Sequence, residues 1–290
     1  MPDSLRIGIT GVTGFIGSHV AAEARNRGHQ ITGFSRSGRS DRLFSVEQPV
    51  DCSGLDAVIH LAGESILGLW TARKKKRIME SRTAGTRSVV EGMRRAPVRP
   101  RVLVCASAVG FYGNTGDSIH DESAGSGSGF LSEVAQAWEL EARKATELGA
   151  RVVCLRIGFV IGKGGAMRLI RPVFRWGLGG NLGNGRQWMS GIHVEDVAGM
   201  AVWAAENNAI HGPVNAVMPE PFRNSDFTKA VAQAVHRPAV LPAPAFAIRG
   251  LLGGLSGLLL DSVRVVPHVA SAGGYTWRFP RLQEAVTSSI

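Results

Sequence analysis

The feature that most constrains this chain is a glycine-rich turn at residues 10–17, TGVTGFIG, directly after the apolar run RIGIT. Its glycines follow a G-x-x-G-x-x-G pattern, and a helical pattern that ends at Gly28 comes next. The first glycine permits a tight turn, the second lets a pyrophosphate approach the backbone, and the third allows close helix packing. Free N–H groups at the start of the helix attract phosphate. The turn therefore predicts a dinucleotide site, and its contributors are Gly11, Thr13, Gly14, Phe15, Ile16 and Gly17.

Short apolar runs alternate with helical patterns over the first half of the chain. The runs AVIHL and RVLVCA are continuously apolar, which is typical of parallel strands covered on both faces. Helices are predicted over 71–95 and 130–148, between successive runs. The pattern predicts an α/β fold, a doubly wound Rossmann-type parallel sheet.

The regular alternation loosens after Gly158, where the sequence becomes rich in Gly, Arg and Trp. A chain of 290 residues can hold one large core and a small satellite domain. We expect a Rossmann domain over 1–236, with 166–211 contributing partly to a substrate lobe. A small C-terminal substrate or cap domain is expected over 237–290.

The end of the second predicted strand indicates the type of cofactor. An NAD site places Asp or Glu about 20 residues past the turn, where the carboxylate binds the ribose hydroxyls. This chain has FSRSGR instead, with Ser35, Arg36 and Arg39 and no acid. Arginine at this place stacks on adenine and pairs with a 2′-phosphate. The sequence therefore predicts NADP rather than NAD; the alternative is that these are loop arginines on a basic protein.

The formal charge of +10 is concentrated in one segment. Residues 71–101 hold eleven basic and two acidic residues, a net of +9, and include RKKKR at 73–77. No aromatic side chains interleave with this run, which argues against nucleic acid as a partner. We interpret the run as a solvated helix face. Attraction of an anionic substrate or of the phosphorylated cofactor is the alternative.

Composition is that of a soluble globular protein, with 44% hydrophobic and 19% charged residues. The stretch AFAIRGLLGGLSGLLLDS is interrupted by Arg249 and by small residues, so no membrane partner is expected. Cys52, Cys105 and Cys154 lack metal-ligand spacing and are expected to be buried free thiols. With no signal-peptide layout at the N-terminus, we expect a cytoplasmic protein without a metal. The oligomeric state is open.

Several motifs occur in one order along the chain: TGVTGFIG, DAVIHLAGES, ASAVGFYG, LRIGFVIG and IHVEDVA. Over residues 5–236 the chain resembles the extended short-chain dehydrogenase/reductases, the group that contains nucleotide-sugar epimerases and dehydratases. Finer motifs, such as GNGRQWMSGIHVEDV and the tail GYTWRFP, are similar to an atypical subgroup of epimerase-family proteins. Members of this subgroup carry a short C-terminal domain of unknown function.

The resemblance implies roles by position. Gly158 and Phe159 should border the nicotinamide, and Ser107 should face the reacting centre. The loop before IHVEDVA should hold the substrate through Arg186 and Trp188; a packing loop is the alternative. His193 should order its loop rather than act in catalysis. The cofactor should also be lined by Leu61, Ala62, Gly63, Glu64 and Ala106.

Arg82 occupies the position at which ordinary relatives have the Asn of N-x-x-G-T. Helical spacing puts it on one stripe with Ile78, Gly85, Val89 and Met93, so its side chain should face the sheet. An inward guanidinium needs a carboxylate, phosphate or carbonyl partner. A structural ion pair and a contact to the cofactor are both open.

The usual catalytic pair of the family is absent. Counting from Glu139, the resemblance puts Leu131 and Ala135 where related enzymes have Tyr and Lys. Neither side chain transfers a proton, and loss of a positioned proton donor lowers a rate by about 10²–10⁴-fold. Our catalytic candidates are Ser107 and Tyr112, whose phenol an inward arginine would push towards ionisation.

Two points qualify this choice. Ser107 is offset by one residue from the usual distance to Tyr112. Glu64 and Glu133 are alternative bases if they are buried.

Together these patterns predict an NADP-binding, epimerase-like oxidoreductase. Its reaction would be hydride transfer on a small polar substrate, with nucleotide sugars as the class that the resemblance suggests. The alternative is a non-catalytic protein that senses NADP or binds a partner. In such a protein the loss of the Tyr-Lys pair would be the change that abolished catalysis.

Overall fold

The computed structural model describes residues 4–36 and 40–290 and is built on a seven-stranded sheet in which every pair is parallel. The strand order is β10-β6-β5-β4-β1-β2-β3. From β1 the chain adds β2 and β3 on one side and then crosses back to add β4, β5, β6 and β10 on the other side. This is the arrangement of a doubly wound fold. The strands are β1 Arg6–Thr10, β2 Gln30–Ser35, β3 Arg42–Leu43, β4 Ala57–His60, β5 Val102–Ala108, β6 Arg151–Ile157 and β10 Gly212–Ala216.

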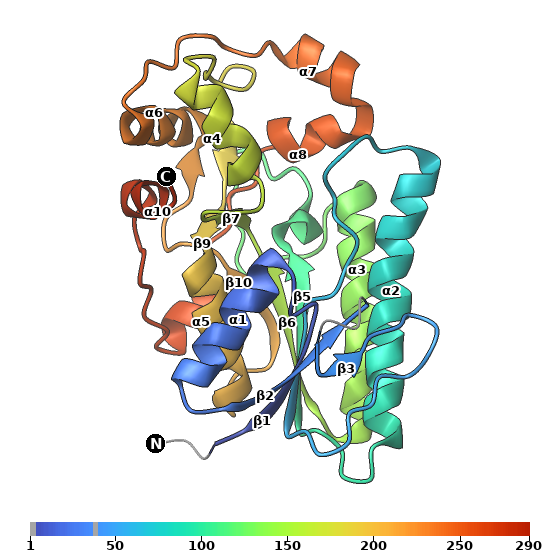
Figure 1. Cartoon of the computed structure of the whole chain (residues 1–290). Coiled ribbons are helices and arrows are strands. Elements are labelled where there is room, and N and C mark those ends of the chain that lie inside the picture. Colours follow the sequence, from blue (N-terminus) through green and yellow to red (C-terminus); the bar gives the residue numbers. More distant parts are fainter. Residues whose placement is uncertain (1–3, 37–39) are drawn as a thin grey trace.

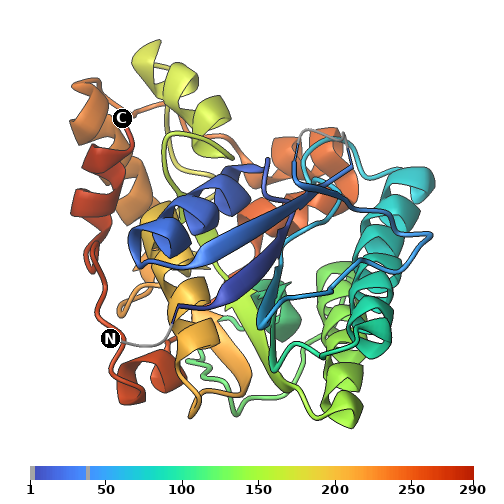
Figure 2. The same ribbon diagram turned by 60° about the horizontal axis from the view of Figure 1, so that its bottom comes forward.

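Helices cover both faces of this sheet (Figures 1 and 2). Helices α1 (Phe15–Asn26) and α5 (Val194–Glu206) pack together on one face, and α2 (Ala72–Arg95) and α3 (Phe130–Arg143) pack together on the other. The strands are therefore buried on both faces, as the continuously apolar runs predicted. The predicted fold class is confirmed.

The two long helices lie close to their predicted ranges. Thr71 precedes α2, and its side chain accepts a hydrogen bond from the Lys74 N–H, which caps the helix. Helix α3 ends at Arg143, and a 3₁₀ turn over Lys144–Leu148 completes the stretch that the sequence predicted as one helix. Both differences lie at helix ends, where propensity patterns are least informative.

A second group of elements lies above the carboxyl ends of the strands in Figure 1. Helices α4 (Met167–Arg175), α6 (Asn224–Val235) and α10 (Leu282–Ser288) share an apolar cluster. Two short strand pairs connect this group to the sheet. The remaining elements are β7 Phe159–Ile161, β8 Trp188–Met189, β9 Gly191–His193, β11 Phe222–Arg223, η1 Val109–Tyr112, α7 Ala245–Leu252, η3 Gly253–Ser256, α8 Gly257–Leu260 and α9 His268–Ala272.

The C-terminal segment returns to the Rossmann body through Asp196 at the start of α5. The buried Asp196 carboxylate accepts the backbone N–H groups of Arg278 and Phe279 at 2.7 and 3.0 Å. The Tyr275 hydroxyl donates to the Asp196 carbonyl. The GYTWRFP motif is thus the docking segment of the tail, and the domain boundary at 236/237 stays a prediction. Among the described residues, no helix is both long and apolar enough to cross a membrane.

Candidate functional site

The glycine-rich turn forms a tight cradle at the carboxyl end of β1. Gly11 has a φ of +71°, in the left-handed region that favours glycine. A side chain on Gly17 would collide with the carbonyl oxygen of Gly11, so the turn and α1 approach each other as closely as backbones can. Gly14 is the N-cap of α1; it makes no side-chain cap bond, and the first turn carries no acidic residue. The first N–H groups of α1 are therefore available to an anion.

Thr10 joins this cradle to the end of β4. Its hydroxyl oxygen accepts the N–H groups of Leu61 and Ala62 at 3.1 and 3.2 Å and contacts His60 Nδ1 at 2.7 Å. A side chain on Gly11 would lie 3.1 Å from the Ala62 backbone. The two motifs that the sequence assigned to the cofactor therefore meet at one edge of the sheet.

Phe15 closes a further side of the cradle. Side chains on Gly162, Gly164 and Gly165 would contact its ring, so the loop before α4 lies directly on the first residue of α1. Thr13 and Gly14 remain exposed, and Ile16 is half-buried.

The end of β2 presents a basic residue, as the NADP prediction requires. Ser35 ends the strand and is buried, and its hydroxyl accepts a hydrogen bond from Ser40. Arg36 follows and is exposed. Arg39 lies outside the residues that the structure describes. The end of β2 therefore carries the Arg36 cation where the adenosine ribose is bound in such folds, while the Asp41 carboxylate accepts the Gly33 N–H of the strand at 2.7 Å.

Arg82 points inward, as its helical position predicted. Its Nη1 donates to the carbonyl oxygens of Glu64 and Ile78 at 3.0 and 3.2 Å, and its guanidinium lies 4.9 Å from the Trp138 ring centroid. A side chain on Gly63 would contact it. Burial lowers the pKa of Arg82 to about 10, against the attraction of Glu64. The residue thus rests on backbone carbonyls beside the cofactor-lining segment.

Ser107 and Tyr112 belong to one buried polar network. The Ser107 hydroxyl donates to Glu139 Oε1 at 2.8 Å. Arg156 donates to both oxygens of Glu139 at 2.8 and 2.9 Å and to the Tyr112 oxygen at 2.8 Å. The Tyr112 hydroxyl in turn donates to Asn215 Oδ1 at 2.8 Å. All five side chains are buried.

The arginine beside Tyr112 is thus Arg156 rather than Arg82. Burial raises the pKa of Tyr112, although Arg156 and Asn215 act in the opposite direction. The phenol therefore stays protonated near neutral pH, contrary to the expected push towards ionisation. The catalytic roles of Ser107 and Tyr112 stay predictions.

The position expected for the family's Tyr-Lys pair is apolar in the fold as well. Leu131 lies against Gly110, where an added side chain would be 3.2 Å from its Cβ. Ala135 is buried in a small cluster with Phe111, Tyr112 and Val217. Leu131 and Ala135 therefore serve in packing, and the hydroxyl group in their described surroundings is that of Tyr112.

Comparison with known proteins places this geometry in a family. Residues 7–216 match the NAD dependent epimerase/dehydratase family, and residues 243–288 match a domain of unknown function, DUF1731.

The chain belongs to the NAD dependent epimerase/dehydratase family.

The relatives of this epimerase-family chain cover nearly its whole length. It is 35% identical over 299 residues to the epimerase family protein YfhF of Bacillus subtilis, covering 99% of this chain and 98% of the relative. The solved human epimerase family protein SDR39U1 (isoform2) with NADPH has a TM-score of 0.92 and 31% identity, covering 98% of this chain and 99% of that one.

A nucleoside-diphosphate sugar epimerase from Corynebacterium glutamicum has a TM-score of 0.82 and 29% identity, covering 99% of this chain and 58% of that one. The family predicted from the motifs is confirmed by these matches.

Three further residues assigned to the cofactor in this epimerase-family chain lie along β5, β6 and β7. Ala106 is buried within β5. Gly158 connects β6 to β7 at a place where a side chain would collide with the Ser190 carbonyl. The Phe159 ring packs edge-on against Phe227, 5.4 Å between centroids, and so joins the apolar cluster of α6.

Arg186 and Trp188 lie in different surroundings from the cofactor-lining motifs. The Trp188 indole donates to Asp117 Oδ1 at 2.7 Å, and the guanidinium groups of Arg223 and Arg264 lie 4.3 and 4.1 Å from its ring centroid. Arg186 is exposed, and its carbonyl accepts from Arg223. Trp188 thus joins β8 to the loops around Asp117 and Arg264, and substrate binding by the pair stays a prediction.

His193 orders its loop. Its Nδ1 accepts the Glu195 N–H at the start of α5, and its Nε2 contacts the Ser288 hydroxyl at 3.1 Å. Burial lowers the pKa of His193 to about 4, so the ring is neutral and its Nδ1 free to accept near neutral pH.

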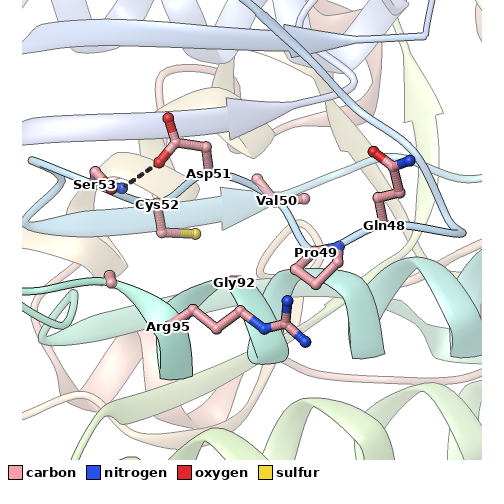
Figure 3. A pocket seen from close by; sticks show the side chains of 9 residues that line it. Gln48, Pro49, Val50, Asp51, Cys52, Ser53, Gly92 and Arg95 are labelled. Atoms are coloured by element: carbon pink, nitrogen blue, oxygen red, sulfur yellow. Dashed lines mark hydrogen bonds between the residues drawn. The ribbon is translucent and has the colours of Figure 1, made fainter.

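A cavity of about 390 Å³ lies elsewhere, between the segment 48–53 and the C-terminal half of α2 (Figure 3). Gln48, Asp51 and Arg95 are among its polar lining residues. Burial raises the pKa of the Cys52 thiol there to about 12, so it is not a nucleophile. In the part of the chain that the structure describes, no cluster of side chains is suited to a metal ion.

Arg156 and Asn215 were missed by the sequence reasoning. The signal for Arg156 was a single arginine inside the apolar run RVVCLRIG, because a buried guanidinium requires a partner. Asn215 carried no comparable signal in GPVNAVM, since its partners come from distant segments.

Proposed function

We propose that this chain binds NADP(H) and acts as an epimerase-like oxidoreductase on a small polar substrate. The observation that carries the proposal is the pairing of an uncapped, acid-free α1 N-terminus with Arg36 at the end of β2. The first fits a pyrophosphate and the second fits a 2′-phosphate. The NADPH bound to the solved human relative, at 31% identity, supports the same cofactor here.

In this proposal the nicotinamide supplies the hydride-transfer chemistry when bound. The N–H groups of Phe15, Ile16 and Gly17 hold the pyrophosphate, and Leu61, Ala62 and Gly63 line the cofactor beside them. Gly158 and Phe159 border the ring. Ser107 and Tyr112 are the groups proposed to hold or move a proton, through hydroxyls whose partners are Glu139, Arg156 and Asn215.

Nucleotide sugars are the proposed substrate class. The name of the Corynebacterium glutamicum relative supports this choice. The three free, buried cysteines support a reducing compartment, and we propose a cytoplasmic location.

Binding measured by calorimetry tests the cofactor assignment. NADPH should bind at least about tenfold more tightly than NADH, since one lost charge-assisted contact is worth about that factor. Arg36→Ala should reduce this preference by about tenfold. Equal affinities in the wild-type protein would contradict the proposal.

A second function is favoured by a specific observation: Leu131 and Ala135 replace the proton-transfer pair, while the Ser107 and Tyr112 hydroxyls have buried internal partners. These features suit a protein that binds NADP(H) without turnover. Carbonyl-dependent oxidation of NADPH across a panel of nucleotide sugars and simple ketones separates the two. Binding without turnover on the whole panel would favour the non-catalytic function.

A further inference from the structure

The basic run RKKKR at the start of α2 does not form a single solvated face. Lys75 lies over the Phe130 ring, 5.2 Å from its centroid. Arg73 and Lys76 are exposed, and Lys76 has only a loose contact to Glu80 at 3.7 Å. Lys74 and Arg77, one helical turn apart, both point to Glu64, past the end of β4. The interpretation as a solvated face therefore holds for only part of the run.

Glu64 is fixed by several contacts to α2. Its N–H donates to the Ser81 hydroxyl at 2.9 Å, and its carbonyl accepts from Arg82 at 3.0 Å. Its carboxylate accepts from Lys74 Nζ at 2.7 Å and lies 3.4 Å from Arg77 Nη2. The Lys74 and Glu64 side chains are only 13% and 21% exposed. The two cations are thus held in register with the segment that lines the cofactor site.

Arg36 and Glu64 follow β2 and β4, which flank β1 with Phe34 and His60 both in register with Thr10, so the two residues lie beyond the same edge of the sheet. The pKa of Glu64 is held below its usual range by the hydrogen bond from Lys74 and by the nearby charges of Arg77 and Arg36. Three cations, Lys74, Arg77 and Arg36, and two carboxylates, Glu64 and Asp41, thus lie around the ends of β2 and β4 and leave a net positive charge; the Asp41 carboxylate accepts the Gly33 N–H of β2 at 2.7 Å. A net positive cluster attracts a phosphate monoester, whose charge is about −1.5 to −2 near neutral pH.

We propose that Lys74 and Arg77 join Arg36 to bind the 2′-phosphate of NADP(H), with Glu64 holding the two α2 cations in place. This inference rests on the proposed NADP(H) binding. A lysine held by one carboxylate oxygen keeps two further N–H donors, and Arg77, which is 54% exposed, keeps most of its five. The 2′-phosphate would thus be held from two directions, by the β2 end and by α2.

Calorimetric binding of NADPH, NADH, 2′,5′-ADP and ADP to the full chain tests the proposal. Arg77→Ala should weaken NADPH and 2′,5′-ADP by about tenfold, the effect of losing one charge-assisted contact. NADH and ADP should change less than about twofold. Lys74→Met should act in the same direction, and thermal unfolding of each variant checks that it folds.

Lys76→Ala is the matched control, because it removes the same charge from the same helix at a residue that contacts Glu80 instead of Glu64. Its NADPH affinity should change less than about twofold at 0.15 M salt, where the screening length is about 8 Å. Unchanged NADPH affinity in Arg77→Ala, or an equal loss for NADH, would overturn the inference. Failure of the wild-type protein to prefer NADPH would instead overturn the proposed function.

Discussion

Arg156 and Glu139 form a two-pronged ion pair between β6 and α3, with hydrogen bonds of 2.8 and 2.9 Å. Neither side chain is more than 2% exposed. The parallel register sets Ser107 beside Arg156, and Glu139 accepts from both. Because the pair is buried, removal of either partner leaves an uncompensated charge in the core, which costs more than the loss of a surface ion pair.

Glu139→Ala should lower the free energy of unfolding by about 3–5 kcal/mol, because it leaves the Arg156 guanidinium buried without its carboxylate. Urea titration at pH 7.5 measures this change. Arg143→Ala is the control: Arg143 contacts the same carboxylate at 3.2 Å, but its side chain is 56% exposed. Its cost should stay below about 1 kcal/mol. Equal losses of unfolding free energy in the two variants would show that the buried pair stabilises the fold no more than the exposed contact does.

Tyr112→Phe should cost about 1–3 kcal/mol, since Asn215 Oδ1 loses its donor. If Tyr112 transfers a proton, kcat should also fall by about 10²–10⁴-fold at temperatures where the variant is fully folded. Ser107→Ala should behave similarly in activity. Steady-state kinetics with any substrate found to turn over provide the measurement, and unchanged kcat in both variants would remove the catalytic assignment.

Asp196→Ala should destabilise the protein by at least about 2 kcal/mol, because two buried backbone N–H groups, of Arg278 and Phe279, lose their acceptor. Hydrogen exchange should increase at these amides. Glu195→Ala is the comparison, since Glu195 is half-exposed and lies 3.8 Å from Arg278. Unaltered exchange in Asp196→Ala would mean that the tail docks by its apolar contacts alone.

Acid should destabilise the fold through two histidines. Burial lowers the pKa of His60 to about 3 and of His193 to about 4, both below the usual value near 6.5. Each therefore binds a proton more readily in the unfolded chain. The contribution of the two neutral histidines to stability is fully present above about pH 6.5 and is lost as the pH drops towards 4.

The His193→Asn variant isolates one of these two groups. Its urea midpoint should depend less on pH between 6.5 and 5 than that of the wild-type protein, even if it is lower at pH 7.5. Parallel pH profiles for the variant and the wild-type protein would rule out His193 as a contributor.

Local patterns determined much of this fold. The spacing of Gly11, Gly14 and Gly17 predicts the cradle because only a residue without a side chain fits there, which is a property of the turn itself. The inward direction of Arg82 followed from helical periodicity, which the fold retains. Continuous apolar runs predicted strands covered on both faces, because a strand buried on both sides has no polar face to alternate with.

Tertiary structure alone decided which polar groups meet. Arg156 pairs with Glu139 from another element, and Tyr112 pairs with Asn215, 103 residues away. Lys74 and Arg77 contact Glu64 in the fold, whereas Lys76, from the same basic run, contacts Glu80. The sequence specifies a hydrophobic period and a local backbone preference, but the free energy of a buried charge depends on the groups that surround it. Those surroundings exist only once distant segments have packed together.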